Sequence, residues 1–170
     1  MVIVFQTALI VTTFLCSMVA GFLLAFLLVI MPGIGNLSDK DFIKSFQAID
    51  KIIQDGQPIF IFIWVGSILV IILTAIVGMF QLNGMMLFLI IAVTSIYIIG
   101  VQLPTILINV PLNNKLQSID IDNLYEEALL NEREKFETRW NKWNFIRTAF
   151  ACLTSFILIG LVFNQTNLGL

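Results

Sequence analysis

The charged residues of this chain are confined to two windows, residues 39–55 and 115–147. All nine Lys and Arg and all eleven Asp and Glu lie there, and the rest of the 170-residue sequence is uncharged and mostly apolar. A soluble domain of this length would spread its charges along every helix or strand, because each element needs a face that water can hydrate. The distribution therefore predicts an integral membrane protein.

The uncharged stretches supply most of four segments that can each cross a hydrocarbon core about 30 Å thick. Within a bilayer only helices and closed barrels satisfy the backbone, and these apolar runs lack the alternation of a barrel strand. We therefore predict an all-α fold, an integral membrane four-helix bundle that forms a single domain over residues 1–170. The expected membrane helices cover residues 2–30, 59–80, 85–108 and 145–163.

The two charged connections are also predicted to be helical. Residues 38–41 resemble a capping box, and apolar residues at helical spacing follow them up to Gly56. This pattern predicts an amphipathic interfacial helix over residues 39–54. Residues 122–144 contain no Gly or Pro and are rich in good helix formers, so we expect a cytoplasmic extension of the fourth helix. The short turn at residues 81–84 makes the second and third helices antiparallel neighbours.

The orientation follows from the basic residues. Four crossings place both charged connections on one side of the membrane, and that side holds every Lys and Arg. The positive-inside rule then predicts cytoplasmic charged loops and outside termini, and we place the protein in a bacterial plasma (inner) membrane with the lipid bilayer as a partner. No basic tract could follow a phosphate backbone, so no nucleic acid partner is expected. The sequence leaves a monomer and an oligomer both open.

Polar residues of the third and fourth helices gather near the charged side. The third helix carries a stripe that we expect to face inward, made of Ser95, Gln102, Thr105 and Asn109. On the fourth helix, Trp140, Trp143, Asn144 and Arg147 share one face, and Arg147 is the deepest charge in the chain. One interpretation is an interfacial anchor, with the tryptophans in the aromatic belt and the arginine at the lipid phosphates. The other is an inward site near the end of the third helix.

Four sequence elements, in their order and spacing, resemble the anthrone oxygenase family of four-helix integral membrane proteins. They are MPG (31–33), FQAID (46–50), NVPLNNKL (109–116) and RWNKWNFIRT (139–148). The resemblance covers nearly the whole chain and implies a four-helix fold with these motifs gathered at one membrane face. For the fungal polyketide-pathway members it also implies oxidation of an anthrone to an anthraquinone by dioxygen, without metal or flavin.

Carried over residue by residue, the resemblance implies a substrate-binding set. Its members are Gln47, Asn109, Asn113, Trp140, Trp143, Asn144 and Arg147. Arg147, Asn144 and Asn109 are also the candidate catalytic residues, because their N–H groups could stabilise an enolate-like anion. Asp50 and Glu137 are weaker candidates for the base that removes a proton.

One departure from the family pattern bears on catalysis. The family often places a histidine close to the Trp-Asn pair, whereas Phe145 and Ile146 follow Trp143-Asn144 here, and the chain contains no histidine. A base that depended on that imidazole would be absent. Without histidine, haem and copper sites lack their usual ligands, so no metal and no cofactor is expected.

Two functional hypotheses remain open at this stage. In the first, the charged membrane face binds a small apolar or aromatic molecule or a lipid, or simply clamps the third helix to the fourth in a non-enzymatic protein. In the second, the protein is a cofactor-independent oxygenase that oxidises an anthrone-like polyketide with dioxygen. The sequence favours binding slightly over catalysis, because no residue has the profile of a tuned base.

Overall fold

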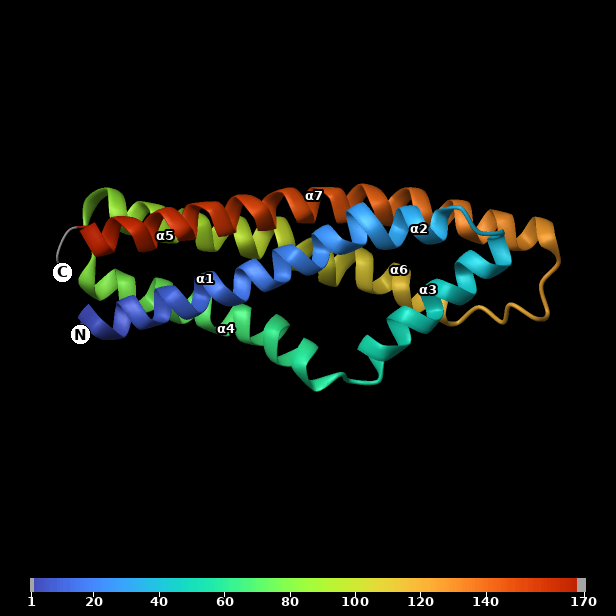
Figure 1. The fold of residues 1–170 in the computed structure, drawn as a ribbon, viewed down its shortest axis with the longest axis horizontal. Helices are drawn as coiled ribbons and strands as arrows, with labels where there is room; N and C mark the ends of the chain where they lie inside the picture. The colour runs from blue at the N-terminus through green and yellow to red at the C-terminus, as the bar shows by residue number, and fades with distance from the viewer. Residues whose placement is uncertain (1, 168–170) are drawn as a thin grey trace.

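The computed structural model describes residues 2–167, and the end residues of the predicted domain, 1 and 168–170, lie outside the described part. Within it the backbone is helical nearly throughout and contains no strand. Long helices lie side by side along the longest axis, and the blue start and the red end of the described part lie at the same end of the molecule (Figure 1). The prediction of an all-helical fold is confirmed.

The helices follow one another with short connections. The first long helix combines α1 (Val2–Ala25), the π-helical segment η1 (Phe26–Ile30) and α2 (Met31–Gly35). It is followed by α3 (Asp39–Gln54) and α4 (Pro58–Gln81). The third long helix consists of α5 (Gly84–Tyr97), the π-helical segments η2 (Ile98–Gln102) and η3 (Thr105–Asn109), and α6 (Val110–Gln117). The last is α7 (Glu126–Asn167).

Four of these helices are long and apolar enough to cross a membrane, as the sequence predicted. They are Ile3–Gly35, Pro58–Gln81, Gly84–Gln117 and Glu126–Asn164. The first and third extend past their predicted ends and continue through Pro32 and Pro111, and in each a π-helical segment directly precedes the segment that contains the proline. The extension of the last helix begins at Glu126 rather than at residue 122, because the Asp120 carboxylate accepts bonds from Asp122 and Asn123 and holds a turn.

The long helices pack around two apolar clusters. Helix α1 packs against α4 and α7, and α5 packs against the same two helices. The first cluster lies between these helices and includes Leu9, Val19, Ile71, Tyr97 and Leu158. The second lies toward the charged end, beneath α3, and includes Phe26, Phe42, Phe46, Phe136 and Trp140. Many large apolar side chains are exposed on the outer faces, as expected of helices that lipid surrounds.

The predicted polar stripe of the third helix is only partly buried. Gln102, Thr105 and Asn109 are buried, but Ser95 is exposed and bonds back to the carbonyl of Ile91. The prediction was wrong for Ser95 because it assumed a constant 100° per residue. The π-helical segment η2 lies between Ser95 and Thr105, and an extra residue in a turn rotates the face that follows.

Arg133 of α7 bonds to the connection between α2 and α3. Arg133 Nη2 donates to the carbonyl of Gly35 (2.7 Å), and Nη1 donates to the carbonyl of Leu37 (2.9 Å) and to Asp39 Oδ1 (2.9 Å). Its Nε donates to Glu137 Oε2 at 2.8 Å. These five residues, the Arg133 clamp, connect the ends of α2 and α3 to α7 and leave every guanidinium nitrogen with a partner.

Candidate functional site

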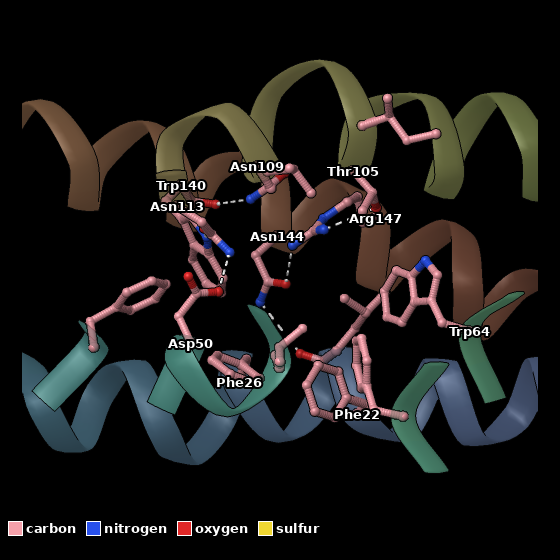
Figure 2. Close-up of a pocket in the computed structure, with 16 residues that line it drawn as sticks. Phe22, Phe26, Asp50, Trp64, Thr105, Asn109, Asn113, Trp140, Asn144 and Arg147 are labelled. Carbon is pink, nitrogen blue, oxygen red and sulfur yellow. Dashed lines mark hydrogen bonds between the residues drawn. The ribbon is translucent and has the colours of Figure 1, made fainter. Parts of the chain in front are cut away.

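A cavity of about 300 Å³ lies toward the charged end, between η1, α3, α4, η3 and α7 (Figure 2). Its wall is mainly aromatic and includes Phe22, Phe26, Phe46, Phe60, Trp64 and Trp140. Its polar lining consists of Asp50, Thr105, Asn109, Asn113, Asn144 and Arg147. The volume and the mixture of an apolar wall with a few convergent polar groups are those of a small-molecule site.

The irregular helical segments position part of this lining. Thr105 and Asn109 are the first and last residues of η3, and both are buried side chains of the cavity wall. Pro104 precedes them and lacks the N–H that a regular α-helix would use, which favours a local change of winding. Phe26, at the start of η1, reaches the opposite wall. Two π-helical segments therefore face the same cavity.

Arg147 is a buried cation without a charged partner. Its side chain is 4% exposed; Nη1 donates to Thr105 Oγ1 at 3.0 Å and Nη2 to Asn144 Oδ1 at 3.1 Å. The Nε–H has no hydrogen-bond partner in the protein. Among the described residues, no carboxylate lies within salt-bridge distance of the guanidinium. A buried charge with neutral partners alone is costly, so the cavity is suited to an anion.

The two asparagines beside Arg147 add further polar groups. Asn109 Nδ2 donates to the carbonyl of Trp140 at 3.4 Å, and its buried Oδ1 has no partner in the protein. Asn144 Nδ2 donates to the carbonyl of Leu23 at 3.4 Å and its Oδ1 accepts from Arg147. The site thus offers a free donor on Arg147 and a free acceptor on Asn109.

A second chain of hydrogen bonds ends on a buried carboxylate. Trp140 Nε1 donates to Asn113 Oδ1 at 2.8 Å, and Asn113 Nδ2 donates to Asp50 Oδ1 at 2.8 Å. The other Asp50 oxygen accepts from Gln54. Desolvation raises the pKa of Asp50 above its ordinary value, and the bonds from Gln54 and Asn113 oppose that rise. Asp50 is therefore a stronger base than an exposed aspartate.

Five of the seven residues that the resemblance marked line this one cavity. They are Asn109, Asn113, Trp140, Asn144 and Arg147. Gln47 does not: its Nε2 donates to the carbonyls of Leu116 (2.9 Å) and Ile119 (3.0 Å) at the end of α6. Trp143 is half-buried and also does not line the cavity. Of the two base candidates, Asp50 lines it, whereas Glu137 belongs to the Arg133 clamp.

Most of the aromatic wall could not be predicted from the sequence. Phe22, Phe26 and Phe60 lie in apolar segments, where any phenylalanine is equally compatible with a lipid-facing position. Trp64 carried the one usable signal, because it is a polar-tipped aromatic side chain within a span. In the structure its Nε1 donates to Gln102 Oε1 at 3.0 Å. Predicting this hydrogen bond from the sequence would have placed Trp64 and Gln102 at the same depth in the membrane.

Comparison with models of protein families shows to which family the chain belongs. The family model described as anthrone oxygenase matches residues 51–158, which is more than half of the chain. The chain belongs to the anthrone oxygenase family. A search of curated proteins finds no match, and neither does a search of solved structures. The part that matches the anthrone oxygenase family contains five polar residues of the cavity, Thr105, Asn109, Asn113, Asn144 and Arg147, and begins directly after Asp50.

Proposed function

We propose that this anthrone oxygenase family member binds one small, flat aromatic molecule that carries an ionisable oxygen. The observation that supports this most strongly is the buried guanidinium of Arg147, which has a free Nε–H and no carboxylate partner among the described residues, inside an aromatic-walled cavity. Aromatic rings contact one another through offset or edge-to-face packing, and Phe22, Phe60 and Trp64 already pack in this way at the wall. A ligand ring would extend that cluster.

The polar lining specifies where the ligand oxygen would lie. An anionic oxygen beside Arg147 Nε would accept a charge-assisted hydrogen bond, which is about twice as strong as a neutral one. The free Oδ1 of Asn109 would accept from a hydroxyl on the same ring system. A phospholipid head group would meet the same cation, but the aromatic wall gives no advantage to an acyl chain over a fused ring.

Binding is tested with anthrone and anthracene, which differ mainly in the oxygen. Protein in lipid nanodiscs is titrated with each compound, and tryptophan fluorescence reports occupancy. We expect anthrone to bind at least tenfold more tightly than anthracene, and Arg147→Met to remove that preference. Arg139→Met, which replaces an exposed arginine of the same helix, serves as the matched control. Equal affinity for the two compounds in the wild-type protein would refute the proposal.

A second candidate function, oxygenase chemistry, is favoured by the presence of Asp50 in the same cavity. The Asp50 carboxylate would take a proton from the CH₂ group of the anthrone, and Arg147 would stabilise the negative charge that develops on the ring oxygen. The anion passes one electron to dioxygen, and the ring radical and superoxide combine into a carbon-bound peroxide anion. The proton held by Asp50 then converts this anion into the hydroperoxide. Loss of the second C–H proton with cleavage of the O–O bond releases water and the anthraquinone.

This reaction consumes one dioxygen per anthrone and produces one water and no hydrogen peroxide. An oxygen electrode and a peroxide assay measure that stoichiometry. Asp50→Asn should slow oxygen uptake about 100-fold, at the lower limit for losing a general base. Asn109→Ala should slow it by less, because that side chain does not exchange a proton. If Asp50→Asn retains the wild-type rate while anthrone still binds, the binding function stands and the oxygenase assignment fails.

A further inference from the structure

The cavity lining includes apolar residues that also lie at the surface of the protein. Ile106 and Val110 line the cavity and yet are 58% and 42% exposed. Across from them, Ile53 of α3 and Phe60 of α4 line it and are half-buried. These four residues define the mouth. None of the four can hydrogen-bond through its side chain or carry a charge.

The backbone around Gly56 brings two of these residues to the same edge. Gly56 has a φ of +83°, a conformation that side-chain-bearing residues rarely adopt, and it lies in the short connection between α3 and α4. Gln57 then caps α4, with its side chain accepting from the N–H of Phe60. The chain thus turns sharply away from the bundle between α3 and α4 (Figure 1). Ile53 and Phe60 end up on either side of that turn.

The depth of the mouth follows from the pairing of two helices. The hydrogen bond between Trp64 and Gln102 places these residues at one level, so Phe60 and Ile106 also lie near one level in antiparallel helices. Helix α4 has 24 residues and is therefore about 36 Å long, against a hydrocarbon core of about 30 Å. Phe60, in its first turn, lies near the boundary between hydrocarbon and head groups on the charged side.

The surface beside Ile106 and Phe60 is apolar as well. Leu103 and Leu107 flank Ile106 on the third long helix, and Ile59 precedes Phe60; all three are exposed. Such a surface within candidate spans is the kind that lipid covers. Small aromatic molecules with one polar group concentrate at the interface of a bilayer, as tryptophan and tyrosine side chains do. The mouth lies at the depth where such a ligand would be most concentrated.

We propose that the mouth is a lateral gate, through which an aromatic ligand passes between the bilayer and the cavity without crossing the water phase. The existence of this opening to lipid is independent of the proposed function, whereas its use by an aromatic ligand rests on that function. A lipid acyl chain can enter the same opening, and this makes the gate testable without any ligand.

The first experiment uses Trp140, a buried tryptophan of the cavity wall. The chain has three tryptophans, so Trp64→Phe with Trp143→Phe leaves Trp140 as the only one. In vesicles of phosphatidylcholine with brominated acyl chains, we expect strong quenching of Trp140 and little effect of aqueous iodide. Quenching by iodide without quenching by bromine would mean that the cavity opens to water, and would overturn the proposal.

Matched variants then test the position of the gate. In the same background, Ile106→Phe with Val110→Phe narrows the mouth, and Leu103→Phe with Leu107→Phe adds equal bulk to exposed positions that do not line the cavity. We expect the first pair to reduce quenching by brominated lipid at least twofold and the second pair to leave it unchanged. Equal behaviour of the two pairs would place the opening elsewhere and overturn the proposal.

The same pairs of substitutions also test whether anthrone uses the gate. Each pair is introduced into the protein with all three tryptophans, and stopped-flow fluorescence in vesicles loaded with anthrone gives association and dissociation rates. The Ile106→Phe with Val110→Phe pair should slow both rates at least fivefold, and the Leu103→Phe with Leu107→Phe pair should leave them unchanged. Quenching of Trp140 by lipid with no anthrone binding would support the gate and refute the proposed ligand class. If Ile106→Phe with Val110→Phe leaves the association and dissociation rates of anthrone unchanged, the mouth is not the entry route of this ligand.

Discussion

Two arginines of α7 illustrate how differently the same side chain can be used within one helix. Arg133 is 14% exposed and donates to two carbonyls and two carboxylates, so that its charge is fully compensated. Arg147 is 4% exposed and donates to two neutral side-chain oxygens, with Nε unpaired. The first holds the fold together. The second is an uncompensated charge beside a cavity, which is the arrangement expected of a binding site.

The difference arises from what surrounds each residue. Arg133 lies opposite the end of α2, where the carbonyls of Gly35 and Leu37 have no helical partner, and next to Asp39 at the start of α3. Arg147 lies among the middle turns of the long helices, where backbone carbonyls already accept helical hydrogen bonds. There the guanidinium donates to the side-chain oxygens of Thr105 and Asn144.

The largest effect is expected from breaking the Arg133 clamp. Arg133→Met leaves two carboxylates and two carbonyls without their donor and should lower the free energy of unfolding by about 3 kcal/mol. Thermal or chemical unfolding in mild detergent measures this change. Arg139→Met, on the same helix and exposed, should change stability by no more than about 0.5 kcal/mol. A similar loss in both variants would show that the clamp has no special role.

The same substitution at Arg147 should act in the opposite direction on stability. Arg147→Met removes a buried charge that no carboxylate compensates, so the free energy of unfolding should stay constant or rise by about 1 kcal/mol. Anthrone binding should weaken at least tenfold in the same variant, because a charge-assisted bond of about 1.5–3 kcal/mol is lost. A destabilisation as large as that of Arg133→Met would assign Arg147 to the fold rather than to binding.

The ionisation of Asp50 should make the stability of the protein depend on pH. Because its pKa is raised from 3.8 in the folded protein, folding favours the protonated form, and the wild-type protein loses stability as pH rises from about 4 through the folded pKa. Asp50→Asn has no such ionisation, so the wild-type protein should lose stability relative to this variant over that range and then reach a plateau. Melts between pH 4 and 8 in detergent measure the difference. A wild-type protein that instead gains stability relative to Asp50→Asn over this interval would contradict the assigned environment.

The smallest effect concerns the two tryptophans near Arg147. Trp140→Phe removes the bond from Nε1 to Asn113 and should weaken anthrone binding by about 1 kcal/mol, or roughly fivefold. Trp143→Phe, which alters a side chain outside the cavity lining, should change the affinity less than twofold. Isothermal titration in nanodiscs resolves both. If Trp143→Phe has the larger effect, the binding site extends beyond this cavity.

Sequence reasoning identified part of the candidate site and left the rest open for identifiable reasons. Asn109, Asn144 and Arg147 stood out because polar and charged side chains are costly within a span and therefore few. Phe22 and Phe26 could not be found in this way, because an apolar side chain in an apolar segment gives no indication of the direction it faces. The π-helical segments had no clear sequence pattern either, so the facing of Ser95 was predicted wrongly.

The sequence by itself determined the helical, membrane-spanning character of the chain and the end at which its charged residues lie. Both depend on run length and on the exclusion of charge from hydrocarbon, which are properties of local segments. The tertiary structure alone decided that Arg133 is compensated and Arg147 is not, and that Asp50 shares a cavity with Arg147. These outcomes depend on which helix ends and which side-chain oxygens come within about 3 Å of each group, and distant parts of the chain supply them.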